Sequence, residues 1–224
     1  MKKRISLLAV VACICMSAYA QKVFMTGDSH VSGKVYPEEV KKIIEKAKPT
    51  ASFSYWGKGG AGFYTFNDTP SFMETIYKAS PDVLVVHLGT NGCYNLPLDT
   101  TKYQTDIATF YTNVREKLPE CKIVFVTPFY NRNRDVVSTS GKEKKYGPWK
   151  INEKTRGVAD IIIEFAKDKP NTYVVDNNAD AGSVFFEKPG LIRQDNIHLT
   201  VQGYELLGEQ VAGRLLEIDE LWKE

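Results

Sequence analysis

Five short apolar runs, separated by segments of helical periodicity, constrain the fold of this chain more than any other feature. Each run is rich in Val, Ile, Phe and Tyr and is apolar on both faces, as the strands of a buried sheet are. The runs are Val23–Thr26, Ala51–Trp56, Val83–Leu88, Ile123–Thr127 and Tyr173–Asp176. Because each is followed by a helix or a crossover, they predict a doubly wound parallel α/β sheet in one domain.

Three further segments repeat apolar residues at helical spacing. Their apolar positions are Tyr103, Ile107, Phe110, Tyr111, Val114 and Leu118 in the first, Val158, Ile161, Ile162 and Phe165 in the second, and Tyr204, Leu207, Val211, Leu215 and Ile218 in the third. Thr200 precedes the third segment, so we expect it to be the N-cap of the last helix.

The first twenty residues have the pattern of a secretory signal peptide. Basic residues 2–4 precede an apolar run over 5–16, and small residues lead up to Ala20. We therefore expect residues 1–20 to be removed and 21–224 to form the mature domain. The apolar run is too short to span a bilayer, and no other segment of the sequence is a membrane candidate, so no stable membrane insertion is expected after cleavage.

A lipoprotein signal is the alternative interpretation of the same segment, with Val10-Val11-Ala12 preceding a lipid-modified Cys13. It would leave only residues 5–12 as the apolar stretch, which is near the lower limit for a signal. Either route exports the chain to the periplasm or the cell exterior.

The charge balance argues against a nucleic-acid partner. Lys and Arg number 29 against 27 Asp and Glu, and removal of residues 1–20 with their three basic side chains leaves 26 against 27. Proteins that bind nucleic acids usually carry a clear basic excess. A nucleic-acid partner is therefore not expected.

Two cysteines, Cys93 and Cys121, remain after the signal segment is removed. Cys93 follows one predicted strand and Cys121 begins the next. In neighbouring parallel strands these positions lie at opposite ends, about 15 to 20 Å apart. A disulfide cannot reach that far, so we expect both to be free thiols.

Residues whose side chains or amides can take part in catalysis follow the predicted strands. Gly27-Asp28-Ser29-His30 follows the first strand, Gly57–Gly62 the second and Gly89-Thr90-Asn91-Gly92 the third, while Asp195-Asn196-Ile197-His198 precedes the last helix. Ligands of open parallel sheets bind outside the carboxyl ends of the strands. These segments are therefore expected to meet at one site.

The residue types at that site fit acyl transfer. Ser29 can attack a carbonyl if a base removes its proton, and His198 has a side chain suited to that task near neutral pH. Asp195, three residues before His198, can orient the imidazole. His30 is a poorer candidate base, because consecutive side chains of an extended chain point apart.

An oxyanion hole needs fixed hydrogen-bond donors. The backbone amides of Ser29 and Gly60 and the side-chain amide of Asn91 are the expected donors. Glycine allows close backbone approach, and Gly59 and Gly62 compete with Gly60 for this role.

These blocks together resemble the SGNH (GDSL-type) hydrolase family. They are GDS ending at Ser29, the glycine turn around Gly60, GTN ending at Asn91 and DxxH from Asp195 to His198, in the family's order. The resemblance implies a flavodoxin-like three-layer α/β/α sandwich with a five-stranded parallel sheet, and serine esterase chemistry without metal or cofactor. By position it implies Ser29 as nucleophile, His198 as base, Asp195 as its orienter, and Gly60 and Asn91 as oxyanion donors.

Two positions depart from the family's pattern. His30 stands where leucine is common after GDS, and Gly92 stands where an acidic residue often follows GTN. Neither position supplies catalytic chemistry, so these departures bear on the substrate rather than on activity. Substrates of the family include acetylated sugars, lysolipids and thioesters.

Two other motifs could indicate a different function, but the sequence supports each of them less well. Gly57–Gly62 also reads G-x-G-x-x-G, the dinucleotide fingerprint, but the acidic residue that should close the next strand is missing, because Asp82 opens that strand and Gly89 closes it. His87 lies within a strand without a second His or Cys at metal spacing, which predicts a core histidine.

Aromatic residues near the expected site favour a carbohydrate substrate. Trp56 flanks the glycine turn, and a long connection between Phe129 and Trp149 contains Tyr130 and Arg132. Connections of that length tend to be lids or binding loops, or else are disordered, and a solvated surface excursion is the equally weighted alternative. We predict substrate-binding roles for Trp56, Tyr130, Arg132 and Trp149, with core packing of some aromatic residues as the alternative.

The sequence as a whole predicts a secreted serine esterase that acts on small acyl esters, mainly acetyl, of a carbohydrate. The alternatives are a lysophospholipase or thioesterase of the same family, and a catalytically inactive relative that binds carbohydrate.

Overall fold

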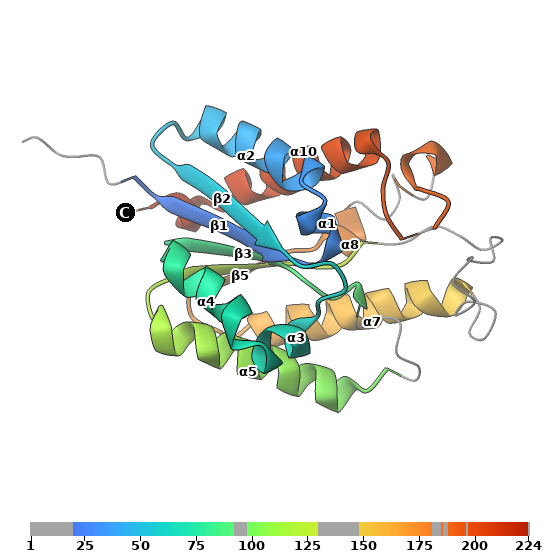
Figure 1. Ribbon diagram of the computed structural model, residues 1–224, viewed down its shortest axis with the longest axis horizontal. Coiled ribbons are helices and arrows are strands. Elements are labelled where there is room, and N and C mark those ends of the chain that lie inside the picture. The colour runs from blue at the N-terminus through green and yellow to red at the C-terminus, as the bar shows by residue number, and fades with distance from the viewer. Residues whose placement is uncertain are drawn as a thin grey trace, which may run out of the picture.

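A five-stranded parallel sheet forms the centre of the protein in a computed structural model (Figure 1). The structure describes residues 20–91, 98–129, 148–180, 185, 188–195 and 197–223, with backbone only for 148–154, 180 and 189. The strands are β1 (Lys22–Gly27), β2 (Ser52–Gly57), β3 (Val83–His87), β4 (Lys122–Val126) and β5 (Thr172–Val175). Their order is β2-β1-β3-β4-β5, with every neighbouring pair parallel. The predicted doubly wound sheet is confirmed.

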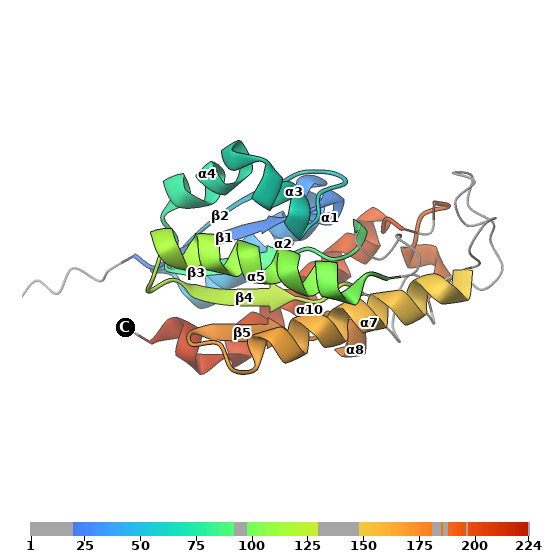
Figure 2. The same ribbon diagram turned by 90° about the horizontal axis from the view of Figure 1, so that it is seen from below.

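Helices cover both faces of this sheet (Figures 1 and 2). The helices are α1 (Ser29–Ser32), α2 (Val35–Ala47), α3 (Phe63–Asp68), α4 (Pro70–Ala79), α5 (Thr100–Lys117), α7 (Pro148–Ala166), α8 (Asn177–Asp180) and α10 (Val201–Glu217), with short 3-10 turns η2 (Pro189–Leu191) and η3 (Asp219–Trp222). Helices α2 and α10 lie on one face, and α3, α4, α5 and α7 lie on the other. This is the three-layer sandwich that the resemblance implies.

Each face of the sheet has its own apolar layer. Between the sheet and the first pair of helices, Val40 of α2 and Leu207 of α10 pack against Met25 of β1. On the opposite face, Leu84 of β3 packs with Phe63 and other aromatic residues of α3 to α5. Strand β3 is buried along its whole length because both of its faces are covered, which explains its continuous apolar run.

The strand order reverses between β1 and β3, since β2 lies on one side of β1 and β3 on the other. At such a switch point the connections that follow the two neighbouring strands run to opposite faces of the sheet, which leaves a crevice at the carboxyl ends of the strands. The first residues after β1, β2 and β3 therefore lie around this crevice.

The start of α10 agrees with the sequence. Thr200 is the N-cap, and its Oγ1 accepts a hydrogen bond from the backbone N–H of Gly203 at 3.3 Å. Among the helices that the structure describes, none is both long and apolar enough to cross a membrane.

Cys121 is a buried free thiol at the amino end of β4. Strands β3 and β4 are parallel neighbours, as the cysteine argument assumed. Cys93 lies outside the described residues, so its pairing stays a prediction.

Candidate active site

Ser29 lies at the point where β1 turns directly into α1. Gly27 pairs with His87 of β3, and a Cβ atom at Gly27 would lie 2.4 Å from the His87 carbonyl oxygen. Only glycine fits this approach. Asp28 then caps α1, because its Oδ1 accepts the backbone N–H of His30 at 3.0 Å. Ser29 and His30 are thus helical, and our assumption of an extended chain at this point is wrong.

The structure brings Ser29, His198 and Asp195 together. The Oγ of Ser29 lies 2.9 Å from Nε2 of His198, and Nδ1 of His198 lies 2.8 Å from Oδ2 of Asp195. All three side chains are partly exposed at the carboxyl end of the sheet. A serine hydroxyl, an imidazole and a carboxylate are therefore joined in one hydrogen-bonded line.

Asp195 is held by the backbone of its own turn. Its Oδ1 accepts the N–H groups of Ile197 at 2.9 Å and of His198 at 2.8 Å, which leaves Oδ2 for the imidazole. Partial burial raises the pKa of Asp195, but these backbone bonds and the bond from His198 outweigh burial and keep its pKa below the usual value. The carboxylate is ionised at neutral pH and fixes the orientation of the ring.

The segment that carries His198 is tied to the preceding chain. The backbone N–H of Arg193 donates to the His198 carbonyl at 2.8 Å, and the N–H of Thr200 donates to Leu191 at 2.9 Å. These bonds place the imidazole just before α10 begins.

The glycine turn after β2 contributes backbone amides. The N–H of Gly62 donates to Oγ1 of Thr65 at 3.0 Å, so this amide is already used. In the part of the chain that the structure describes, the amides of Gly59 and Gly60 have no such acceptor. A Cβ at Gly59 would lie 3.9 Å from Cβ of Ser29, so this turn adjoins the serine. Gly59 and Gly60 are therefore the remaining candidates in this turn for the backbone N–H that binds an oxyanion.

Asn91 directs its side-chain amide toward the same turn. Its Nδ2 donates to the carbonyl of Ala61 at 2.9 Å and lies 3.4 Å from Oδ2 of Asp28. The amide is thus held between the segments that follow β1 and β2. A group on a substrate could take the place of the longer contact.

Asp28 is completely buried beneath these groups. Burial raises its pKa to about 7, although hydrogen bonds from the His30 backbone and the Thr90 side chain lower it in part. Its carboxyl is therefore partly protonated near neutral pH. Sequence reasoning assigned Asp28 no role, because a GDS segment does not reveal how deeply its aspartate is buried.

His87 is a buried core residue, as predicted. Its Nδ1 is 3.1 Å from the hydroxyl of Tyr36, while Nε2 has no partner among the described residues. Burial lowers the pKa of His87 to about 3, so the ring is neutral.

The structure describes the side chain of only one of the four residues predicted to bind substrate. Trp56 is half-buried, and its ring packs against Phe72 at 5.0 Å and Phe66 at 6.1 Å between centroids. Tyr130 and Arg132 lie outside the described residues. Trp149 falls in the first turn of α7, where the structure describes no side chain.

Tyr64 is the exposed aromatic residue next to the glycine turn. Its side chain is 40% exposed, whereas Phe63 and Phe66 beside it are buried. The Nζ of Lys102 lies 5.8 Å from the centre of its ring. Phe63 and Phe66 therefore pack in the core, whereas the ring of Tyr64 remains available to a ligand.

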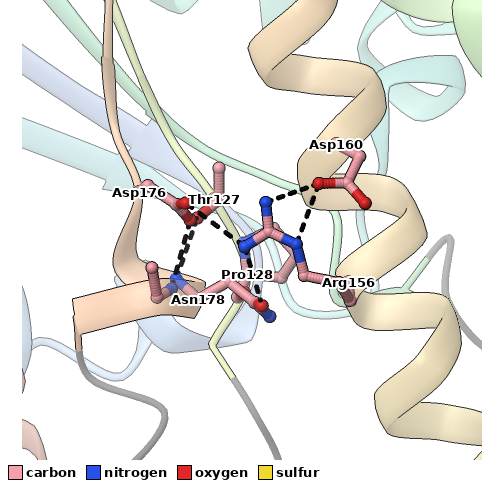
Figure 3. A network of polar contacts seen from close by, with 7 residues as sticks. Thr127, Pro128, Arg156, Asp160, Asp176 and Asn178 are labelled. Carbon is pink, nitrogen blue, oxygen red and sulfur yellow. Dashed lines mark hydrogen bonds and ion pairs between the residues drawn. The ribbon is translucent and has the colours of Figure 1, made fainter.

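A polar network joins the ends of β4 and β5 to α7 and α8 (Figure 3). Oδ1 of Asp176 accepts the Thr127 hydroxyl at 3.0 Å, and Oδ2 accepts from Arg156 at 3.2 Å. Arg156 also pairs with Asp160 through Nε at 2.8 Å, and Asn178 donates to the carbonyl of Pro128 at 3.0 Å. These bonds connect the residues that follow β4 and β5 to α7 and α8. No sequence pattern indicated this network.

No group of three or more His, Cys, Asp or Glu side chains that could hold a metal occurs within the described ranges. The site brings together a serine hydroxyl, an imidazole and nearby amide groups, which are the types of group that acyl transfer uses.

Solved structures with the same fold include several esterases. An acetyl xylan esterase, AlAXEase, is 18% identical with a TM-score of 0.66, covering 87% of this chain and 99% of that one. A catalytic mutant of the acetylxylan esterase Axe2 from Geobacillus stearothermophilus is also 18% identical with a TM-score of 0.66, covering 87% and 94%. A peptidoglycan O-acetylesterase is 12% identical with a TM-score of 0.67, covering 89% and 91%.

These likenesses, at low identity, support the fold. No curated protein matches the chain by sequence. The model of the GDSL-like lipase/acylhydrolase family matches residues 27–206, a span that includes all four blocks from the GDS segment to His198. The chain belongs to the GDSL-like lipase/acylhydrolase family and is a carboxylic ester hydrolase.

Proposed function

We propose that the chain is an exported serine esterase that removes small acyl groups, mainly acetyl, from a carbohydrate. The observation that carries the catalytic part is the line of hydrogen bonds from Ser29 through His198 to Asp195, at 2.9 and 2.8 Å. These lengths suit proton transfer from a hydroxyl to an imidazole that a carboxylate orients.

In the first half of the reaction, Oγ of Ser29 attacks the ester carbonyl carbon while its proton moves to Nε2 of His198. The carbonyl π electrons move to oxygen, and this oxyanion is stabilised by the amides of Ser29, Gly60 and Asn91. Asp195 stabilises the imidazolium through Nδ1–H. The bond to the alcohol then breaks, and the alcohol leaves with the proton from His198.

In the second half, a water molecule attacks the acyl-enzyme and gives its proton to His198. The new tetrahedral intermediate collapses, the bond to Ser29 breaks, and Oγ recovers the proton as the acid departs. His198 is the base in each attack and the acid in each departure. No cofactor enters this scheme.

The proposed substrate class rests on the relatives and on Tyr64. Two of the relatives described above are named as acetyl xylan esterases and one as a peptidoglycan O-acetylesterase. All three names describe acetyl groups on glycans. Tyr64 offers an exposed ring next to the glycine turn, as a face on which a sugar could stack.

Export is part of the proposal because of the pattern of residues 1–20. Cleavage after Ala20 would leave only Gln21 before β1 begins at Lys22, so the sheet would keep all of its strands. Mass spectrometry of the protein purified from its host would give Gln21 as the first residue, whereas a lipid-modified Cys13 would favour anchoring and overturn the soluble form.

The catalytic proposal is tested with a chromogenic acetate ester and a fluorophosphonate. We expect the wild-type protein to hydrolyse the ester and to be labelled at Ser29, and Ser29→Ala to lose both while its melting temperature is retained. Ser32→Ala, on the same short helix, is the matched control and keeps labelling. Turnover by Ser29→Ala at the wild-type rate would refute the assignment.

The substrate proposal needs a separate experiment. Acetate release from acetylated xylan is compared with hydrolysis of esters whose acyl chains lengthen from acetyl to octanoyl. We expect kcat/KM to fall as the chain lengthens. A preference for long chains would instead favour the lysophospholipase alternative, and binding of the glycan without hydrolysis would favour the inactive relative.

A further inference from the structure

A group of buried aromatic rings lies directly behind His198. The ring of His30 is wholly buried, and its centroid lies 5.6 Å from that of His198, 4.9 Å from Phe129 and 5.9 Å from both His87 and Tyr204. His30 therefore contacts the imidazole of the proposed base from the side of the protein interior.

His30 is also hydrogen-bonded to the helix that follows the base. Its Nδ1 lies 3.1 Å from the hydroxyl of Tyr204 on α10. Burial raises the pKa of Tyr204 to about 12. The Tyr204 hydroxyl joins His30, the residue after Ser29, to α10, which begins three residues after His198.

The ring of His30 is neutral in this position. Burial lowers its pKa well below the usual value, and the nearby His87 and His198 lower it further. A neutral ring fills the space behind His198 without repelling the imidazolium that forms during the proposed reaction.

From this arrangement we infer that His30 and Tyr204 are positioning residues, whose hydrogen bond holds α1 and the start of α10 so that Ser29 and His198 stay within reach of each other. The inference rests on the proposed function. Leucine, common after GDS in the family that the chain resembles, has no polar atom for this bond. On this inference the departure at position 30 affects the rate of the reaction, and not only the substrate as the sequence led us to expect.

The opposing explanation is that the bond only stabilises the core. The neighbouring pair His87 and Tyr36 provides a matched comparison, because it has the same chemistry: Nδ1 and hydroxyl are 3.1 Å apart, and both residues are fully buried. None of the described ring contacts joins either residue to His198. Equivalent changes in the two pairs separate positioning from packing.

The experiment uses the variants His30→Leu, Tyr204→Phe and their double, with His87→Leu and Tyr36→Phe as controls. For each we would measure kcat and KM on the chromogenic acetate ester, the rate of fluorophosphonate labelling of Ser29, and the midpoint of urea unfolding. Misplacement of catalytic groups by about 1 Å can cost about 100-fold in rate. We therefore expect His30→Leu to lower kcat by about 10- to 100-fold with KM within about threefold, and labelling to slow in parallel.

The double variant provides the strictest test. If both residues act through one hydrogen bond, the double should be no slower than the slower single variant. The control variants should lose comparable unfolding stability while kcat stays within about threefold of wild type. Independent, multiplying losses in the double, or equal losses of kcat in the controls, would overturn the inference.

Failure of the inference can be told apart from failure of the proposed function. If the wild type is active and labelled at Ser29 but His30→Leu is equally fast in both assays, only the positioning role is refuted. If the wild type neither hydrolyses the ester nor reacts with the fluorophosphonate, the proposed function and the positioning role are both refuted.

Discussion

The side-chain amide of Asn91 donates to the carbonyl oxygen of Ala61 at 2.9 Å, so the two loops expected to form the oxyanion hole are bonded to each other. One amide proton of Asn91 is used in this bond. The other points toward Asp28 across the longer distance of 3.4 Å. The orientation of the amide is thus fixed before a substrate arrives, which is what electrostatic preorganisation requires.

Asn91→Ala should lower kcat by about 10²- to 10³-fold, the typical effect of removing one oxyanion donor. KM should stay within a few fold, because negative charge on the carbonyl oxygen develops only as the tetrahedral intermediate forms. Steady-state kinetics on the acetate ester would measure both. A raised KM with unchanged kcat would instead make Asn91 a residue that binds the ground state.

Gly60→Ala should impair catalysis through backbone conformation and not through steric intrusion. Gly60 has φ of +78°, and a Cβ there would meet nothing within 4 Å. Alanine in the left-handed region costs about 1 to 2 kcal/mol, which the turn can relieve by moving its amide. We expect kcat to fall by more than any decrease in the folded fraction of the protein can explain. Steady-state kinetics gives the change in kcat, and urea unfolding gives the change in stability.

Gly213→Ala is the control for Gly60→Ala. Gly213 lies within α10, has open space at its Cβ position and no positive φ, so alanine should stabilise the protein by about 0.5 to 1 kcal/mol and leave kcat unchanged. Equal kinetic behaviour of the two variants would remove Gly60 from the list of oxyanion donors.

The strands could be predicted to within one residue. For β1, β3 and β4 the reason is that burial on both faces leaves a mainly apolar run, whereas the edge strands β2 and β5 are only partly buried. The run Val83–Leu88, for example, corresponds to β3 at Val83–His87. The approach of Ser29 to His198, 169 residues apart, could be anticipated because both motifs were expected at the carboxyl end of one parallel sheet.

Other features had no signal in the sequence. Helix α1 has only four residues, which is too short to show a periodicity, so its start at Ser29 was missed. The orientation of Trp56 depends on Phe72 of α4, and one sequence does not tell which aromatic residues face the core. The bond between His30 and Tyr204 joins positions 174 residues apart that no motif pairs.

Tyr64→Ala should reduce activity on a glycan more than on a small ester. Its exposed ring lies beside the glycine turn, where it can contact a sugar but has no role in activating Ser29. We expect kcat/KM on acetylated xylan to fall about tenfold, as loss of an aromatic contact worth about 1.4 kcal/mol would produce. The chromogenic acetate should be hydrolysed as before, and Tyr64→Phe should behave like the wild type on both. Equal losses on both substrates would argue for a structural role.

Asp28 should make the free energy of unfolding depend on pH. Its pKa is raised from 3.8 to about 7 in the folded protein, mainly by burial. Between these values the folded state retains a proton that the unfolded state has released. Stability contributed by the protonated carboxyl is therefore present below about pH 4 and lost as pH rises to about 7, by up to about 4 kcal/mol.

Asp28→Asn cannot ionise, so it should escape this loss. The difference in unfolding free energy between the variant and the wild type, measured by urea unfolding from pH 4 to pH 8.5, should shift in favour of the variant as pH rises. His87 acts in the opposite direction, because its pKa of about 3 means that stability is lost as pH falls below about 6.5. That contribution is common to both proteins and cancels in the difference. A difference that stays constant over this range would show that Asp28 is ionised throughout, stabilised by the hydrogen bonds from His30 and Thr90.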